Sequence, residues 1–290
     1  MDKASTNIGF VGTGVMGSPM AAHILKEGYK LYVYNRTSTK AQSLIDSGAH
    51  LCENPGQVAK NCDVIFAIVG FPQDVESVFL GSDGIVENAK SGAIIVDMTT
   101  SRPALAKKIA NIAAKKGIQS LDAPVSGGDI GARSGSLSIM VGGERDAYDQ
   151  IFPLFQLMGE NVVYHGPAGS GQHTKMANQI AIASTMLAMC ESLTYAKKAG
   201  LDPQAVLKSI SNGAAGSWTL DNLAPRILRE DYEPGFFVKH FIKDMQIAID
   251  SGESMGVDIS GLKIAKTKFD QIAEEGFLEK GTQSLIKAYE

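Results

Sequence analysis

The stretch that decides the fold lies near the start of the chain and reads Ile8-Gly9-Phe10-Val11-Gly12-Thr13-Gly14-Val15-Met16-Gly17. A short apolar run leads into three glycines with the spacing G-x-G-x-x-G, and a helical pattern follows. In that context Gly12 permits a tight turn, Gly14 lets the backbone approach a pyrophosphate, and Gly17 lets the helix pack closely on the strand. The helix N-terminus adds amide donors and a partial positive charge. The sequence therefore predicts a dinucleotide site at Gly12, Gly14, Val15, Met16 and Gly17, against the alternative of a plain strand-to-helix turn.

The end of the second apolar run, Leu31 to Tyr34, bears on the choice of dinucleotide. An NAD enzyme usually has Asp or Glu there, about 20 residues after the glycines, to bind the ribose 2′-hydroxyl. Here Asn35 takes that place, so no charge repels a 2′-phosphate, and Arg36 can neutralise the phosphate and stack on the adenine. The alternative is that Arg36 is only a solvated surface charge. We predict that NADP(H) is preferred over NAD(H) and that Asn35, Arg36 and Thr37 contact it.

The chain changes character near residue 165. Short apolar runs that predict strands cover residues 8–11, 31–34, 64–69, 93–96, 120–121, 137–141 and 162–164. Helical patterns between them, at residues 19–27, 40–47 and 103–116, indicate parallel strands joined by crossover helices. Residues 172–199 contain neither Gly nor Pro and predict a helix about 42 Å long that Gly200 ends. Further helical patterns cover residues 203–210, 221–230, 238–251 and 261–275.

These patterns predict two domains. The first, residues 1–165, is a Rossmann-type α/β domain with a doubly wound sheet, and the second, residues 166–290, is an all-α domain that a long interdomain helix opens. Ligands of such sheets bind at the carboxyl ends of the strands. The loops at those ends contain Val69-Gly70, Thr100 and Ser126-Gly127-Gly128, which suit close backbone approach and hydrogen bonding to a ligand. A plain Gly-rich turn is the alternative for the last of them.

Lys175 stands out on the long helix. Asn178 and Gln179 follow three and four residues later and share its helix face, and the residues around them are unusually apolar. A partly desolvated lysine in such a place has a lowered pKa and can exchange protons near neutral pH. The alternative, a solvated surface lysine, is the common one. His240 and Asp244 have helical i, i+4 spacing, and the alternative for them is an ordinary surface pair.

Composition excludes several classes of function. Of the 290 residues, 44% are hydrophobic and 20% are charged, and the formal net charge of −4 comes without any Lys/Arg-rich run that would bind nucleic acid or an anionic membrane. The three cysteines, Cys52, Cys62 and Cys190, are odd in number and widely spaced, which fits neither a disulfide framework nor a zinc site. No signal-peptide pattern opens the chain, and no apolar run approaches the roughly 20 residues of a membrane span. We expect a cytoplasmic protein with no metal.

The chain resembles the β-hydroxyacid dehydrogenase family over nearly its whole length. The matching elements are residues 9–17, then Asp122-Ala123-Pro124-Val125-Ser126-Gly127-Gly128, then Gly169-Ser170-Gly171-Gln172-His173-Thr174-Lys175, and then Lys243-Asp244. That family includes 3-hydroxyisobutyrate dehydrogenases, tartronate semialdehyde reductases and glyoxylate/succinic semialdehyde reductases. The resemblance implies a hydride transfer between NADP(H) and a small 3-hydroxy acid or semialdehyde. It also implies a homodimer or homotetramer.

The resemblance further implies roles for single residues. Lys175 matches the catalytic lysine, Ser126, Gly127 and Gly128 match the loop for the substrate carboxylate, and Thr100 matches a threonine near nicotinamide and substrate. Lys243 matches a cofactor contact, Asp244 a residue that orders the site, and Phe236 an aromatic residue against the substrate. In one respect the chain departs from the pattern: the family often has Asn four residues after the lysine, where this chain has Gln179 and places Asn178 one residue earlier. The substrate pocket is then expected to differ in size.

Two rival interpretations stay open. One is an imine reductase on the same fold, which Lys175 disfavours because members of that branch usually lack the lysine. The other is a binding module that holds the cofactor without turnover. Decarboxylation in the manner of 6-phosphogluconate dehydrogenase is disfavoured because the C-terminal half is short and offers no evident sugar-phosphate site.

Overall fold

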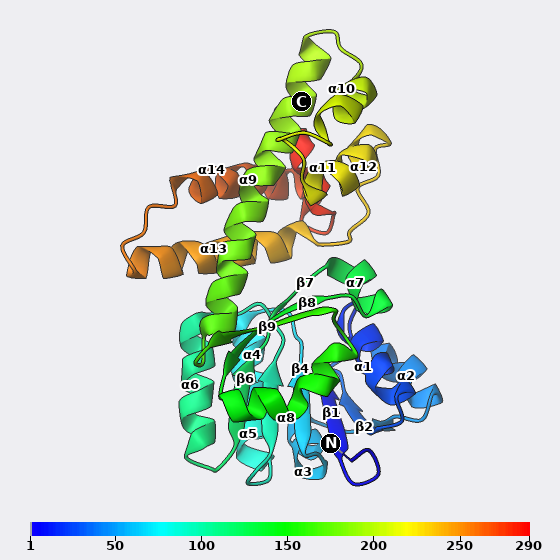
Figure 1. The fold of residues 1–290 in the computed structure, drawn as a ribbon, viewed down its shortest axis with the longest axis vertical. Coiled ribbons are helices and arrows are strands. Elements are labelled where there is room, and N and C mark those ends of the chain that lie inside the picture. The colour runs from blue at the N-terminus through cyan, green and yellow to red at the C-terminus, as the bar shows by residue number, and fades with distance from the viewer. Residues whose placement is uncertain (1) are drawn as a thin grey trace. The chain divides into compact units, whose positions relative to one another are not determined.

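Among residues 2–290, which this computed structural model describes, nine strands form a single sheet (Figure 1). The strands are β1 (Asn7–Val11), β2 (Lys30–Tyr34), β3 (His50–Leu51), β4 (Val64–Ala67), β5 (Ile94–Asp97), β6 (Gln119–Asp122), β7 (Val125–Ser126), β8 (Ser138–Gly143) and β9 (Asn161–Gly166). Their order is β3-β2-β1-β4-β5-β6-β8-β7, with β9 paired to β8. The strands from β3 to β6 are parallel. The prediction of a Rossmann-type doubly wound sheet is confirmed, with its topological switch point between β1 and β4.

The far end of the sheet differs from the prediction of parallel strands throughout. Strand β8 runs antiparallel to both β6 and β7, whereas β9 is parallel to β8. The reason lies in the connections, because β7 and a short helix turn the chain back before β8, whereas a full crossover helix separates β8 from β9. Strands β3 and β7 have two residues each, which is too short for a pattern in the sequence to show them.

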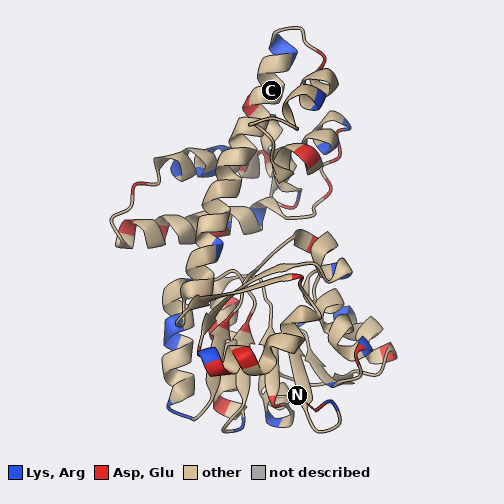
Figure 2. Ribbon diagram, in the orientation of Figure 1, with Lys and Arg blue, Asp and Glu red and all other residues tan. Residues whose placement is uncertain are grey.

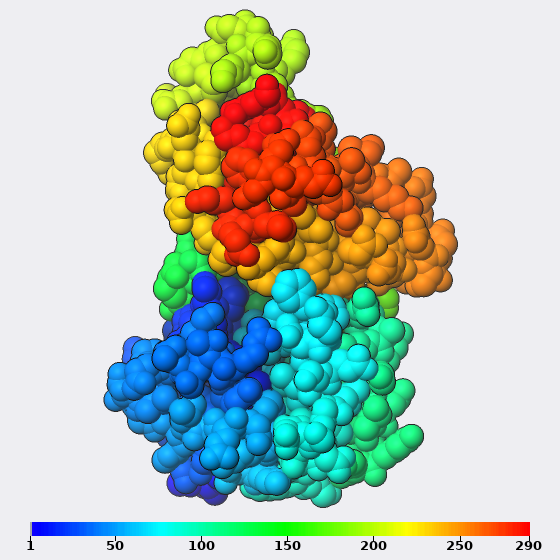
Figure 3. Space-filling model, turned by 180° about the vertical axis from the view of Figure 1, so that it is seen from behind, coloured from blue at the N-terminus to red at the C-terminus, as the bar shows by residue number. Residues whose placement is uncertain are grey.

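Helices cover both faces of this sheet. They are α1 (Gly17–Lys26), η1 (Ser38–Ala41), α2 (Gln42–Asp46), α3 (Pro55–Asn61), α4 (Pro72–Leu80), α5 (Ile85–Asn88), α6 (Pro103–Ala114), α7 (Gly128–Ser134) and α8 (Arg145–Gln156). Residues of β4 alternate between two cores, since Val64 and Phe66 pack with α1, α2 and α8, and Ile65 and Ala67 pack with α3 to α6. Figure 3 shows this second face from outside, with light-blue, cyan and green segments side by side. Burial on both faces explains why the central strands are apolar throughout.

The remaining elements of the described chain are helical. They are α9 (Ser170–Lys198), α10 (Pro203–Ile210), α11 (Trp218–Asn222), α12 (Ala224–Leu228), α13 (Val238–Ser254), α14 (Ser260–Ile272), the π-helical turn η2 (Ala273–Phe277) and the 3₁₀ helix η3 (Thr282–Tyr289). A core formed by residues of α9 to α14 and η3 holds them together. The helix expected at residues 221–230 is instead two short helices, because Pro225 lacks the N–H that a continuous helix needs. No helix within residues 2–290 is long and apolar enough to cross a membrane.

The chain divides into a first unit that ends at Lys175 and a second unit, Met176–Glu290. The boundary therefore falls inside α9, later than residue 165, where the strands were expected to stop. The start of α9 groups with the sheet because the backbone N–H groups of Gly169 and Gln172 donate hydrogen bonds to Asp122 at the end of β6.

Two glycines of the loop between β1 and α1 differ sharply in their surroundings. A Cβ on Gly17 would overlap the carbonyl oxygen of Gly12, whereas a Cβ on Gly14 would meet no atom within 4 Å. We expect Gly17→Ala to lower the free energy of unfolding by about 1–3 kcal/mol through overpacking. The matched variant Gly14→Ala is expected to change it by less than about 0.5 kcal/mol. Urea unfolding followed by circular dichroism measures both, and equal stability of the two variants would contradict this account of the turn.

Candidate functional site

The glycine loop is fastened to the end of β2 by one side chain. The Asn35 amide accepts a hydrogen bond from the Thr13 backbone N–H at 2.9 Å and donates one to the Thr37 carbonyl at 2.8 Å. Gly12, with φ of 92°, donates its N–H to the Tyr34 carbonyl at 2.8 Å. The cofactor contact predicted for Asn35 thus falls on a side chain that already holds the loop in shape.

The surface of this loop fits a bound dinucleotide. Open space lies in front of Gly14, and the next residue, Val15, is 59% exposed, while Met16 is half-buried. The Thr13 hydroxyl is buried and has no hydrogen-bond partner among residues 2–290. An open backbone and an unsatisfied donor at the start of α1 suit phosphate oxygens.

Arg36 and Thr37 lie exposed just past β2. The Arg36 guanidinium pairs with the carboxylate of Asp74, on the first turn of α4, at 3.4 Å. The sequence predicts a role for Arg36 but none for Asp74. The two residues lie 38 positions apart, and no local pattern links them.

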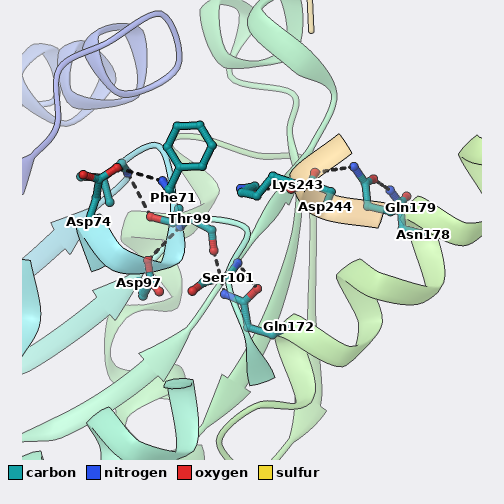
Figure 4. A network of polar contacts seen from close by, with 11 residues as sticks. Phe71, Asp74, Asp97, Thr99, Ser101, Gln172, Asn178, Gln179, Lys243 and Asp244 are labelled. Atoms are coloured by element: carbon teal, nitrogen blue, oxygen red, sulfur yellow. Dashed lines mark hydrogen bonds and ion pairs between the residues drawn. The ribbon is translucent and has the colours of Figure 1, made fainter. Parts of the chain in front are cut away.

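A buried network joins the loops at the strand ends to the first turn of α9 (Figure 4). Val69 donates its N–H to the Thr99 hydroxyl at 2.9 Å, and Thr99 donates its own N–H to the Asp97 carboxylate at 3.0 Å. The Gln172 side chain then donates to the Thr99 carbonyl at 2.7 Å and accepts the Ser101 N–H at 2.8 Å. Gln172 therefore brackets Thr100 on both sides. Val69, Gly70 and Thr100, all predicted site residues, are half-buried along this edge.

Asp122, at the end of β6, fixes the same turn of α9. Its two carboxylate oxygens accept the N–H groups of Gly169 and Gln172, both at 2.8 Å. Burial raises the pKa of the Asp122 carboxyl, while these backbone hydrogen bonds act in the opposite direction. These two bonds hold the start of α9 at the end of β6.

Lys175 follows one turn after these anchors and is 6% exposed. The next charged residue along α9 is Glu191, and Figure 2 shows the intervening helix without charge. Lys175 is therefore a buried residue, and the interpretation as a solvated surface lysine is wrong.

The loop predicted to hold a carboxylate begins in β7. Ser126 pairs with Ser138 of β8 and is half-buried. Gly127 and Gly128 have φ of 125° and 61°, which other residues adopt only with strain. Two such residues in succession turn the chain sharply into α7, whose first N–H groups lack intrahelical partners.

The second unit contains its own polar cluster (Figure 4). Asn178 donates to the Gln179 side chain, which donates to the Asp244 carboxylate, both at 2.7 Å. Asp244 also pairs with Lys243 at 3.0 Å, and Gln179 and Asp244 are both 1% exposed. Gln179, the residue that departs from the family pattern, is thus engaged in holding Asp244. The pairing of Gln179 with Asp244 could not be predicted from the sequence, since the two residues lie 65 positions apart.

Two neighbours complete that cluster. Phe236 packs on Phe241 with ring centroids 5.7 Å apart. Burial, together with the charge of Lys243, lowers the pKa of the His240 imidazole, which favours its neutral form. No group of three or more His, Cys, Asp and Glu side chains that could hold a metal ion occurs within residues 2–290.

Two family models match the chain in succession. The NAD-binding domain of 6-phosphogluconate dehydrogenase matches residues 7–166. The NAD-binding domain of NADP-dependent 3-hydroxyisobutyrate dehydrogenase matches residues 169–289. The chain belongs to the β-hydroxyacid dehydrogenase family. It is therefore an oxidoreductase with an NAD-binding domain of the Rossmann type.

Relatives within the family match almost end to end. A probable 3-hydroxyisobutyrate dehydrogenase-like protein of Arabidopsis thaliana is 48% identical over 99% of this chain and 86% of its own. The 2-hydroxy-3-oxopropionate reductase of Escherichia coli is 36% identical over 98% of this chain and 97% of its own. The solved 3-hydroxyisobutyrate dehydrogenase of Mycobacterium tuberculosis, with L-serine, has a TM-score of 0.89 at 24% identity and covers 97% of this chain and 98% of its own, which shows a shared fold.

Proposed function

We propose that this β-hydroxyacid dehydrogenase interconverts a small 3-hydroxy acid and its semialdehyde, with Lys175 exchanging the proton and NADP(H) preferred over NAD(H). The observation that carries the proposal is the burial of Lys175, which is 6% exposed and lies one turn after the anchors at Asp122 and Gln172. Those anchors bind the same helix turn to the loop that holds Thr100. The residue proposed to exchange the proton therefore directly follows a hydrogen-bonded network that includes the loop proposed to bind a ligand.

The chemistry divides between cofactor and protein. A nicotinamide dinucleotide, when bound, would supply or take the hydride. In the reducing direction Lys175, as an ammonium, donates a hydrogen bond to the substrate carbonyl oxygen and delivers its proton there. A fixed cation at that oxygen stabilises the negative charge that develops in the transition state. In the oxidising direction neutral Lys175 takes the proton of the alcohol.

The remaining roles are proposed from the family pattern together with the local geometry. The Ser126 hydroxyl and the backbone N–H groups of Gly127 and Gly128 hold the substrate carboxylate. The other proposed substrate contacts are Thr100, Asn178, Gln179 and Phe236. The proposed cofactor contacts are Gly12, Gly14, Val15, Met16, Gly17, Asn35, Arg36, Thr37, Val69, Gly70, Thr100, Lys243 and Asp244. The acid substrate itself is supported by the relatives, whose names indicate 3-hydroxyisobutyrate and 2-hydroxy-3-oxopropionate chemistry.

Initial rates of NADPH and NADH oxidation test the proposal. The panel consists of succinic, methylmalonic and tartronic semialdehydes with glyoxylate, and a cyclic imine represents the rival activity. We expect turnover of at least one semialdehyde with NADPH. We also expect Arg36→Ala to raise the KM for NADPH about tenfold and leave the KM for NADH unchanged, because only NADPH carries the 2′-phosphate that Arg36 neutralises. Turnover of the imine alone would replace the proposed function, and binding of cofactor without any turnover would favour a binding module.

A further inference from the structure

Asp74 occupies a position that the proposed catalytic and binding roles leave unexplained. It is the third residue of α4, and one of its carboxylate oxygens accepts the Phe71 backbone N–H at 3.1 Å (Figure 4). This bond holds the carboxylate at the N-terminus of the helix, where a negative charge is also favoured by the helix dipole. The Asp74 side chain is accordingly 27% exposed. The negative charge of Asp74 is therefore held in place at the start of α4 by the Phe71 backbone N–H.

The second oxygen of Asp74 faces Arg36. It lies 3.4 Å from one guanidinium nitrogen, and the Arg36 side chain is 87% exposed. The two residues follow the carboxyl ends of β2 and β4, which flank β1 in the sheet. The Arg36 side chain is thus surrounded by solvent, whereas Asp74 is restrained by its bond to the Phe71 N–H. A guanidinium has five N–H donors, so it can pair with Asp74 and still bind a second anion.

We infer that Asp74 is a specificity-determining residue that sets how strongly this chain prefers NADP(H) over NAD(H). The inference rests on the proposed role of Arg36 at the 2′-phosphate. Asp74 competes for the guanidinium and places a fixed negative charge beside any phosphate that Arg36 binds. A phosphate monoester carries a charge of about −1.5 to −2 at neutral pH, so it is repelled, whereas a ribose with a free 2′-hydroxyl is not. Asp74 therefore weakens binding of the phosphorylated cofactor alone.

The solvent exposure of the Arg36–Asp74 pair determines how strongly Asp74 can affect binding of the 2′-phosphate. Charges separated by several Å in nearly aqueous surroundings interact weakly, and surface pairs are screened further by salt. We expect Asp74→Asn to tighten binding of NADP⁺ about fivefold at low ionic strength. The gain should shrink as salt is raised. Binding of NAD⁺ should stay within about twofold, because Asn can still accept the Phe71 N–H and keep α4 in place.

The test is equilibrium binding to the cofactor-free protein by calorimetry, with no turnover involved. The ligands are NADP⁺, NAD⁺, 2′,5′-ADP and 5′-AMP, so that the phosphate is the single difference within each pair. Glu76→Gln is the matched control, since Glu76 lies on the same helix, is exposed, and pairs with Lys108 instead. We expect the ratio of Kd values for NAD⁺ and NADP⁺ to rise about fivefold in Asp74→Asn and to stay at the wild-type value in Glu76→Gln.

Two results would overturn the inference while leaving the proposed function intact. The ratio in Asp74→Asn could equal that in Glu76→Gln, or NADP⁺ could bind more weakly, which would mean that Asp74 orients Arg36 toward the phosphate. A wild-type chain that binds neither dinucleotide would overturn both the inference and the proposed function. Arg36→Ala separates these cases, because loss of the NADP⁺ preference in that variant places the phosphate at Arg36 independently of Asp74.

Discussion

Replacing Lys175 by alanine is expected to lower kcat for semialdehyde reduction by about 10²–10⁴-fold, the usual contribution of a positioned general acid. The Lys175 ammonium is the group proposed to deliver the proton and to stabilise the charge that develops on the carbonyl oxygen. Its removal takes away both effects at once. The affinity for NADP⁺ should change by less than about threefold, because the glycine loop and Arg36 remain intact. Steady-state rates and calorimetry on the same preparation measure the two quantities.

The control for this variant comes from the same helix. Lys197→Ala removes an exposed lysine in the last turn of α9 and should leave kcat within about twofold of the wild type. Lys175→Arg keeps a positive charge but replaces a compact proton donor by a guanidinium that does not deprotonate, so it should remain strongly impaired. Turnover by Lys175→Ala at the rate of Lys197→Ala would remove Lys175 from the mechanism.

The parts of the fold that could be predicted are those with local signals. The G-x-G-x-x-G loop, the apolar strands and the uninterrupted helix after residue 170 each follow from neighbouring residues. Helices α3, α4, α5, α7 and α8 and strands β3 and β7 were not among the predicted segments. All of them except α8, which contains Pro153, have nine residues or fewer, too few to show a clear period. The antiparallel pairing of β8 was missed because it depends on how a two-residue strand and a short helix turn the chain.

The residues of the candidate site likewise fall into those with a local sequence signal and those that act through long-range contacts. Lys175, Arg36 and the Gly127-Gly128 turn could be named from the sequence, and the geometry gives each a defined setting. Gln172, Asp122 and Asp74 could not be given roles, because each acts on residues far away along the chain. Asp122 binds an amide 47 residues later, and Gln172 binds a carbonyl 73 residues earlier. Such pairs exist only once the sheet has brought its strand ends together.

Replacing Gln172 by leucine is expected to be among the most damaging single changes in the first unit. Gln172 is 0% exposed, and its amide satisfies the Thr99 carbonyl and the Ser101 N–H. Leucine has a similar size but no polar atoms, so both backbone groups lose their partner in the interior. Each unsatisfied group costs about 1–3 kcal/mol, and the variant should lose about 2–5 kcal/mol of unfolding free energy. Urea unfolding measures the loss, and Gln246→Leu, at an exposed glutamine of α13, should lose less than about 0.5 kcal/mol.

Gln172 also has a consequence for catalysis that stability alone would not produce. Because its amide joins the Thr99–Ser101 segment to the turn of α9 that precedes Lys175, its loss frees Thr100, a proposed substrate and cofactor contact, to move independently of Lys175. A misplacement of about 1 Å can lower a rate about 100-fold, so kcat should fall by roughly that factor in the fraction that remains folded. The Kd for NADP⁺ should change much less than kcat, since the glycine loop and Arg36 do not contact Gln172, although Thr100, a proposed cofactor contact, does depend on it. A variant that is merely less stable would show a normal kcat once corrected for its folded fraction, and that result would reduce Gln172 to a structural role. Gln172→Glu keeps an acceptor for the Ser101 N–H but loses the donor to Thr99, so its kcat should lie between those of the wild type and Gln172→Leu.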